Sequence, residues 1–390
     1  MRTARRRTIL KVAGVAAAGL TATGVWRAWD QGVFSSSEGP AYAPWETWRS
    51  DAPSPVHRMV RAAVLAANPH NSQPWRFRVT ATSVDLFADH TRNIGAIDPY
   101  LREMHVGLGC ALENLLLSAP ASGFGHELVL LPTPSDPAHV ASVQLAPQTL
   151  PVSPLYDAIP RRHTNRGAYD KRPVSTSLLE EMQTFGSDLP LVTVKWIASP
   201  DARRQFGELI VEATQAIIAD PEQSRDSAAW FRGNWQEIQQ RCDGLTVDAQ
   251  ALPGWLRVAA KVLPPASQAQ ADDIWLNATR DVQVATAAAF GIILARDAGD
   301  NANRIQGGRL WQRMQLHGVT RGVAMQPLNQ LPERADRERS LKSKSRFGNA
   351  LKDLTADAGW QALMPFRLGY PTLVPLPSPR RGIQEVTIAA

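Results

Sequence analysis

The sequence has few of the residues that common catalytic and structural motifs require. It contains only two cysteines, Cys110 and Cys242, among 390 residues, so a disulfide framework is excluded. Spacings typical of metal ligands, such as C-x-x-C or H-E-x-x-H, do not occur. The G-x-S-x-G motif of many hydrolases is absent, and no paired carboxylates stand out. These absences argue against a disulfide scaffold, a zinc site and a serine hydrolase.

The positive charge of the chain is concentrated at its start. The net charge is +6, but residues 1–30 hold six basic residues and one acidic residue, so the remainder is close to neutral. A near-neutral body gives no support for nucleic-acid binding, and we expect no such partner. With 44% hydrophobic and 20% charged residues, the chain should be globular, with one large or two modest domains.

The first residues match an export signal. Arg6-Arg7-Thr8-Ile9-Leu10-Lys11 has the order of a twin-arginine motif, and an apolar segment from Val12 to Val25 follows it. This segment has signal-peptide length and is short for a membrane span. The pattern predicts use of the twin-arginine export machinery and a folded, cofactor-loaded protein in the periplasm or cell envelope. A positive-inside anchor is the alternative. Trp26 and Trp29 at the expected cleavage point favour a retained tether, with membrane contact only through this leader.

Periodicity divides the chain into a leader at 1–30, a linker at 31–54, a first half at 55–150 and a second half at 151–390. In the first half it predicts helices at 56–67 and 102–122, and strands at 75–80, 84–88, 127–131 and 140–145. In the second half it predicts helices at 177–185, 203–219, 228–241, 274–296 and 307–318, and strands at 191–197, 322–325 and 366–368. Residues 242–272 carry several prolines and indicate a lid-like insertion. Residues 334–352 are charged enough to suggest a solvated helix or flap.

The two halves share a weak internal echo. Three residue pairs lie 199 positions apart: Gly109 and Gly308, Leu117 and Leu316, Gly123 and Gly322. A helix, a glycine and a strand follow in the same order around both sets. Chance, or the residue preferences that all helices and their ends share, is one explanation of such an echo. Duplication of one α+β unit is the other explanation.

Three polar segments are candidates for a functional site. The turn Asn68-Pro69-His70-Asn71-Ser72-Gln73-Pro74-Trp75 displays polar side chains between a helix and a strand, although a capping turn would look similar. The segment Arg161-Arg162-His163-Thr164-Asn165-Arg166 suits a phosphate, since guanidinium groups bind phosphate oxygens in bidentate fashion. An exposed basic loop is the alternative there. Arg380-Arg381 near the end of the sequence would be unremarkable alone.

Taken together, these segments resemble the FMN-dependent nitroreductase-like superfamily over roughly residues 55–390. Asn71-Ser72-Gln73-Pro74-Trp75 is the most specific match, and Arg162-His163-Thr164-Asn165-Arg166 matches the basic FMN-binding stretch of the family. Gly369-Tyr370-Pro371 and the late pair Arg380-Arg381 also fit. Arg102-Glu103-Met104, leading into Gly107 and Gly109, is similar to the core helix of the twin-arginine-exported branch of this family.

The resemblance implies a role for each matching residue. Arg162 and Thr164, flanked by Arg161 and His163, should hold the phosphate or ribityl chain of FMN, and one of Arg380 and Arg381 should complete the phosphate clamp. Arg166 should lie near the flavin N1 and O2 edge, where a fixed cation favours hydride uptake, and it is the predicted catalytic residue. The first-half turn should contribute Asn68, Pro69, Asn71 and Gln73, and the backbone near Gln326 should face the flavin ring. Asn68 and Pro69 stand where ordinary members carry serines.

The order of the motifs differs from that of ordinary members, in which each subunit begins with the basic stretch and reaches the turn soon after. Here the turn occurs only in the first half and the basic stretch only in the second. With the echo, this predicts an α+β nitroreductase-like fold in which two related halves form an intrachain pseudo-dimer. It also predicts one surviving site and one FMN per chain.

The resemblance implies an exported FMN oxidoreductase that passes hydride through flavin N5 to a small planar acceptor, a nitroaromatic or a quinone, with NAD(P)H as a candidate donor. No G-x-G-x-x-G follows a predicted strand, but the family does not need that motif. The alternative is a protein that binds or sequesters FMN beneath its insertion, with little reductase activity. An exported hydrolase using His70, His105 or His163 as a base is a third class, which no motif supports.

Overall fold

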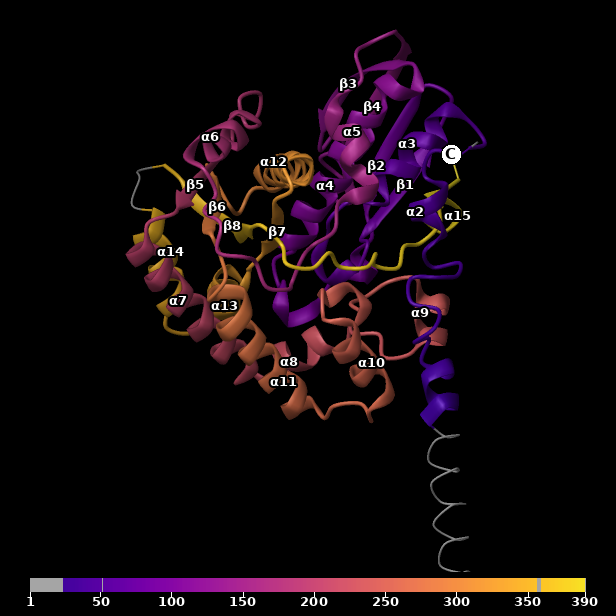
Figure 1. The fold of residues 1–390 in the computed structure, drawn as a ribbon. Coiled ribbons are helices and arrows are strands. Elements are labelled where there is room, and N and C mark those ends of the chain that lie inside the picture. The colour runs from indigo at the N-terminus through magenta and orange to yellow at the C-terminus, as the bar shows by residue number, and fades with distance from the viewer. Residues whose placement is uncertain (1–23, 51, 356–358, 390) are drawn as a thin grey trace, which may run out of the picture.

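The fold is α+β, as predicted, and is built on two mainly antiparallel sheets with helices between and around them (Figure 1). The computed structural model describes residues 24–50, 52–355 and 359–389. The predicted twin-arginine motif and most of the apolar segment that follows it lie outside these residues. Within the described part, no helix combines the length and apolar character that crossing a bilayer requires.

The first sheet has five strands in the order β3-β4-β2-β1-β9. Its first four strands come from the first half of the chain: β1 (Trp75–Val79), β2 (Ser83–Ala88), β3 (Phe124–Leu130) and β4 (His139–Pro147). The fifth, β9 (Thr387–Ile388), comes from the far end of the chain and pairs parallel to β1. The C-terminal segment of the second half therefore completes the sheet of the first.

The second sheet repeats the arrangement of the first. Its strands, in chain order, are β5 (Val192–Ile197), β6 (Ala289–Ala295), β7 (Ala324–Pro327) and β8 (Gln361–Gly369), and they lie in the order β5-β6-β8-β7. The first sheet places β1-β2-β4-β3 in the same relative order, and the neighbours in both sets are antiparallel. A long helix separates the second strand from the third in each half: α4 (Arg102–Ser118) and α12 (Asn301–Thr320).

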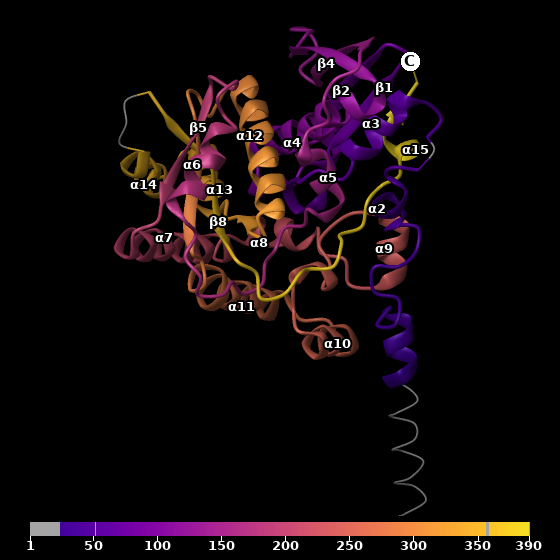
Figure 2. The same cartoon turned by 45° about the horizontal axis from the view of Figure 1, so that its top comes forward.

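The long helices α4 and α12 lie between the two sheets and cross in close contact (Figures 1 and 2). A Cβ built at Gly109 would collide with the backbone carbonyl of Ile305, and one built at Gly308 would collide with that of Val106. Val106 and Ile305 are 199 positions apart, as Gly109 and Gly308 are. The two contacts are therefore the same contact made twice, with the two halves exchanged. This reciprocity is the signature of a two-fold interface, here formed within one chain. The glycines are required because the two backbones touch.

The remaining helices surround this frame. Those next to the first sheet are α2 (Ala43–Thr47), α3 (Pro55–Ala63), α5 (Pro154–Ala158) and α15 (Ile383–Val386). Those associated with the second half are α6 (Thr176–Thr184), α7 (Pro200–Ile218), α8 (Pro221–Ala228), α9 (Trp235–Arg241), α10 (Gly254–Val262), α11 (Gln268–Asn277), α13 (Gln330–Ser340) and α14 (Arg346–Thr355). Helices α8, α10 and α11 lie together below the two sheets in Figure 1.

Two of the predicted helices are wrong, and one predicted segment is less exposed than expected. The helix predicted at 274–296 ends early, because the run Ala289–Ala295 is the central strand β6, buried along its whole length. An apolar run without gaps suits a strand covered on both faces, and periodicity alone does not distinguish it from a buried helix. The helix predicted at 228–241 is interrupted between α8 and α9. The segment at 334–352 is largely helical, as predicted, but it is not fully solvated, because α13 buries Asp336 and Glu338 and α14 buries Phe347.

Candidate functional site

A cavity of about 710 Å³ lies where the two halves and the insertion meet. Asn68, Pro69 and His70 of the first-half turn line it, and so do Thr164 and Arg166 of the basic segment. Its wall also includes Gln326 and Pro327 from β7 and residues of α4 and α12. Its volume falls in the range of about 300–1,000 Å³ that is usual for small-molecule sites. Segments distant in the sequence therefore converge on one cavity.

The first-half turn holds an unusual backbone conformation. His70, Asn71 and Gln73 have φ values of 47°, 54° and 51°, in the left-handed region that non-glycine residues rarely adopt. The side-chain oxygen of Asn68 accepts a hydrogen bond of 2.7 Å from the Gln73 amide and closes the turn. A Cβ on Gly107 of α4 would lie 2.8 Å from Cδ of Pro69, so this glycine lets the turn approach the helix. Such strained backbone is often associated with a functional site.

Asn71 and Gln73 point away from the cavity and into the protein. Asn71 donates to the carbonyls of Gly244 (3.1 Å) and Pro379 (2.8 Å) and accepts from Arg380 (2.7 Å). Gln73 donates to the Cys242 carbonyl and accepts from the Arg381 amide. Neither lines the cavity. In the structure both bind the turn to the insertion and to the C-terminal segment.

Arg162 and Arg380 form a buried cationic pair behind the cavity wall. Arg162 donates to the Gln315 side chain (3.2 Å) and the Leu65 carbonyl (3.1 Å), and it is 2% exposed. Burial lowers the pKa of Arg162 to about 10. Burial and then the nearby charge of Arg162 lower that of Arg380. Among the described residues, no carboxylate lies within ion-pair distance of either guanidinium, and the Nε atom of each has no hydrogen-bond partner. The pair is therefore a buried positive charge, and neither of its two arginines lines the cavity itself.

The residues next to Arg162 and Arg380 in the sequence lie in different surroundings. His163 packs its ring against Trp45, 4.7 Å between centroids, and burial lowers its pKa to about 3, so it is neutral at pH 7. Arg381 instead donates to the carbonyls of Gln73 and Trp75. Arg161 is exposed to solvent and does not line the cavity. Of the two late arginines, Arg380 is the one beside the basic segment.

Arg166 faces the cavity itself. No ion pair to it is found within the part of the chain that the structure describes. Burial lowers its pKa to about 10, and it remains charged at neutral pH. Burial, followed by the charge of Arg166, lowers the pKa of His70 to about 4. The neutral His70 ring is hydrogen-bonded to Ser227 at 3.1 Å. The wall formed by Arg166 and His70 therefore carries one positive charge.

Arg367 on β8 supports this wall and was not identified from the sequence. It is fully buried and donates to Gln326 (2.7 Å) and to the carbonyls of Asn165 (3.2 Å) and Gly167 (2.7 Å). These bonds fix the segment on either side of Arg166. An arginine in the middle of the predicted core strand at 366–368 was the available signal, since arginine is rarely buried without a specific partner.

Two carboxyl groups on another part of the cavity wall were also missed. Glu103 of α4 and Glu333 of α13 both line the cavity, and Glu103 lies 3.4 Å from the guanidinium of Arg102. Burial raises the pKa of Glu103 to about 7, and burial together with the charge of Glu103 raises that of Glu333 above its ordinary value. Arg102, which bonds Asp336 at 2.8 Å, partly offsets the effect on Glu103. The pair can hold a proton near neutral pH.

Replacing Glu333 with glutamine should flatten the dependence of stability on pH. The folded protein keeps protons on this pair up to about pH 7, whereas the unfolded chain releases them near pH 4.3. Because the folded state binds more protons in that window, stability conferred by the pair is lost as pH rises through it. Thermal unfolding between pH 5 and 8 should show a smaller decline for Glu333→Gln than for the unaltered chain or for Glu180→Gln on the exposed face of α6. An equal decline in all three would exclude the shared proton.

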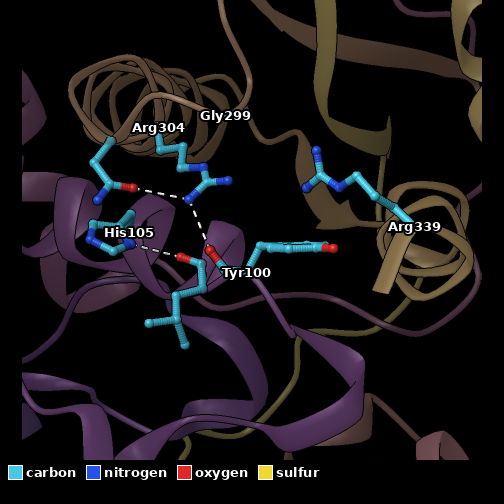
Figure 3. A pocket seen from close by; sticks show the side chains of 7 residues that line it. Tyr100, His105, Gly299, Arg304 and Arg339 are labelled. Atoms are coloured by element: carbon cyan, nitrogen blue, oxygen red, sulfur yellow. Dashed lines mark hydrogen bonds between the residues drawn. The ribbon is translucent and has the colours of Figure 1, made fainter. Parts of the chain in front are cut away.

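A second cavity, of about 460 Å³, lies where the N-terminal ends of α4 and α12 approach each other (Figure 3). Arg304 donates to the backbone oxygen of Tyr100 and to the side chain of Asn301, both at 2.9 Å. Arg339 lies over the Tyr100 ring, 3.9 Å from its centroid. His105 is bonded to the Leu101 carbonyl at 2.7 Å. None of the residues predicted to bind FMN lines this cavity, so we place the candidate site in the larger one.

Sequence comparison links the chain to nitroreductase-named proteins. No protein-family model matches it. It is 26% identical over 366 residues to "Putative NAD(P)H nitroreductase Rv3131" of Mycobacterium tuberculosis, covering 91% of this chain and 96% of that protein. A nitroreductase-named protein of the same organism, acg, is 33% identical over 121 residues, covering 30% of this chain and 37% of that protein. The uncharacterized protein Rv3127 is 24% identical over 342 residues, covering 84% of this chain and 92% of that protein.

Solved structures give more distant matches. The FMN-dependent nitroreductase NfnB from Mycobacterium smegmatis, solved in complex with NADPH, has a TM-score of 0.39 and 17% identity, covering 60% of this chain and 96% of that one. A nitroreductase-like family protein from Bacillus cereus has a TM-score of 0.32 and 11% identity, covering 61% of this chain and 96% of that one.

Proposed function

We propose that this chain is an FMN-dependent oxidoreductase that transfers hydride from NAD(P)H to a small planar acceptor, a nitroaromatic or a quinone. The observation that carries this proposal is the convergence of the first-half turn and the basic segment on one cavity. The sequence similarity, over 91% of the chain, to a protein named as a putative NAD(P)H nitroreductase supports the same activity.

The donor set of the site fits a phosphate at one end. Arg162 and Arg380 are buried cations without a carboxylate partner among the described residues, and each has an unpartnered Nε atom. The side-chain oxygen of Gln315 accepts a hydrogen bond from Arg162. The Nε2 atom of the same side chain is buried and has no hydrogen-bond partner. A dianionic phosphate would offset the mutual repulsion of the two guanidinium groups and take up these donors. Thr164, which lines the cavity beside them in sequence, would bind the ribityl chain or the phosphate.

The other end of the site suits a planar ring that gains negative charge. Bound FMN supplies hydride chemistry at its N5 atom. Arg166 faces the cavity as a fixed cation, held by the backbone that Arg367 anchors, and would favour charge on the ring edge nearest to it. Asn68 and Pro69 would contact the ring from the first half. The shared proton of Glu103 and Glu333 is available on the same cavity wall for an acceptor.

Replacing Arg166 with alanine should lower the midpoint potential of the bound flavin. Removing the cation weakens binding of the reduced coenzyme more than binding of the oxidised form, and each tenfold difference shifts a two-electron potential by roughly 30 mV. Equilibrium titration against redox dyes would measure this shift. Arg166→Lys, which keeps the charge, should retain most of the potential. An unchanged potential in Arg166→Ala would remove the catalytic role assigned to Arg166.

The single chain would act as a fused pair of nitroreductase-like halves with one surviving site. Support comes from the matching strand order in the two sheets and from the reciprocal glycine contacts of α4 and α12. The turn is present only in the first half and the basic segment only in the second, so only one complete set can form. We further propose export by the twin-arginine route, on the evidence of the sequence before residue 24.

A protein that holds or sequesters FMN with little reductase activity is the second candidate, because the insertion covers the cavity. Leu245, Val247 and Gln250 line it, as do residues of α10 and α11. Stopped-flow mixing of the FMN-loaded protein with NADH or NADPH separates the two functions. Bleaching of the flavin absorbance at a rate suited to turnover supports the enzyme. A flavin inert to both nucleotides but reduced by dithionite supports the binding protein.

A further inference from the structure

Helix α10 buries charged side chains and exposes apolar ones. Its lysine is buried: Nζ of Lys261 lies 2.7 Å from Asp248 and donates to the Gly32 carbonyl at 3.1 Å. Arg257 also turns toward Asp248, at 3.5 Å. The same helix exposes its apolar side chains, with Trp255 73% exposed. A surface helix normally buries its apolar face and exposes its charges, so α10 reverses the usual arrangement and leaves an apolar face without a partner among the described residues.

A second apolar segment lies beside α10. The helix over residues 24–30 exposes Val25 (64%), Trp26 (62%) and Trp29 (71%). It is joined to α10 by a hydrogen bond of 3.0 Å from Arg27 to the Leu263 carbonyl. Figures 1 and 2 both show the two helices at the same end of the molecule. We call the exposed apolar side chains of these two segments the apolar patch: Val25, Trp26, Trp29, Trp255, Leu256, Val258 and Leu263.

The composition of the patch and its surroundings suit a lipid surface. Tryptophan is the residue most typical of the membrane–water interface, and the patch holds three. Helix α10 contains no acidic residue, and Arg27 lies between the two apolar segments, bonded to the Leu263 carbonyl. The sequence leading into residue 24 is apolar from Val12 and is preceded by five basic residues, which complements an anionic bilayer.

The candidate site opens toward the same patch. Arg27 and Gln31 of the N-terminal segment line the large cavity, and so do Ala260, Lys261 and Leu263 of α10 and its end. The cavity therefore extends from Arg166, between the halves, to the apolar patch. The outer part of the cavity and the apolar patch share the side chain of Leu263.

We propose that α10 and the helix at 24–30 dock together on an anionic bilayer, and that the acceptor is a lipid-phase quinone drawn from it. The choice of acceptor rests on the proposed function, whereas the docking does not. The quinone would take up two electrons and two protons and leave as the quinol, as the flavin reduced by NAD(P)H returns to its oxidised state. This extends the expected membrane contact from the leader to the folded body.

The docking is tested with an environment-sensitive fluorophore on the full chain. Val258→Cys carries the label on the patch, and Val129→Cys, 52% exposed on β3, is the matched control. The two native cysteines are buried. With phosphatidylglycerol–phosphatidylcholine vesicles, we expect a blue-shifted signal at position 258 that spin-labelled lipid quenches, and neither effect at 129. Equal signals at both positions would overturn the proposal. The proposal would also be overturned if the signal at position 258 shifted to the blue without vesicles when the protein concentration is raised. In that case a second copy of the chain would cover the patch.

The acceptor is tested by comparing a quinone carrying a long isoprenoid tail in vesicles with its tail-less, water-soluble analogue. The variant Trp255→Gln/Val258→Gln leaves the cavity lining intact. It should slow reoxidation of the reduced flavin by the tailed quinone at least about tenfold and leave the rate with the water-soluble analogue within about twofold. Equal rates with the tailed quinone would overturn a lipid-phase acceptor. If the reduced flavin of the unaltered chain reacts with neither quinone, the proposed acceptor is wrong. Bleaching of the flavin by NAD(P)H still tests the proposed oxidoreductase function separately. The fluorescence signal with vesicles still tests the docking separately.

Discussion

Replacing Arg162 with alanine should weaken FMN binding by roughly 10- to 150-fold, which corresponds to the loss of about 1.5–3 kcal/mol for a charge-assisted hydrogen bond. The effect should be large because Arg162 is buried, has no carboxylate partner among the described residues and lies next to Arg380. In the absence of a phosphate the two charges repel. In its presence both would contribute to binding.

Arg161 provides the matched control for this experiment. It is the preceding residue, carries the same charge and is exposed to solvent. Fluorescence titration of the flavin-free protein with FMN should give nearly the same dissociation constant for Arg161→Ala as for the unaltered chain. Arg162→Lys should fall between the two alanine variants. Equal losses for Arg161→Ala and Arg162→Ala would show that only the overall charge of the segment matters, and would contradict the phosphate site.

Replacing Gly308 with alanine should cost at least about 3 kcal/mol of folding stability, the upper part of the range for overpacked cores. The added Cβ would collide with the Val106 carbonyl, which is part of the α4 backbone and cannot move aside as a side chain could. The two helices would have to separate, and the cavity wall with them. Gly109→Ala should behave alike, because its Cβ would meet the Ile305 carbonyl.

Gly254→Ala at the start of α10 is the control, since nothing lies within 4 Å of the Cβ that it would add. Thermal unfolding of the three variants measures the difference, together with the soluble yield. We expect a clear fall in Tm for Gly308→Ala and Gly109→Ala and almost none for Gly254→Ala. If the variants at 308 and 109 unfold at the temperature of the control, the helices do not meet through these glycines.

The sequence was informative where local patterns decide the structure. The hairpin at 75–88 alternates apolar and polar residues, and both β1 and β2 form there. Gly109 and Gly308 occupy matching positions in the two halves, and the sequence shows this as a repeat. Each is a glycine because the backbone of the other helix leaves no room for a side chain. The first-half turn and the basic segment were recognisable as short motifs, and the structure places Asn68, Pro69, Thr164, Arg166 and Gln326 in one cavity.

Long-range partners limited what the sequence could predict. Asn71 and Gln73 belong to the most specific motif, yet they bond Arg380 and Arg381, more than 300 positions away. No local pattern distinguishes such a bond from a ligand contact. Glu103 and Glu333 are separated in the same way, and only the packing of α13 against the cavity wall makes them a pair. The prolines of residues 242–272 indicate an insertion but do not predict helix α10, whose apolar face is exposed rather than buried.

The flavin content of the purified full-length chain tests the central claim most directly. After saturation with FMN and removal of the excess, absorbance near 450 nm against protein concentration should give one FMN per 390-residue chain. Arg162→Ala should lower that occupancy, whereas Arg161→Ala should not. Two flavins per chain would contradict a single surviving site, and no bound flavin would contradict the FMN site altogether.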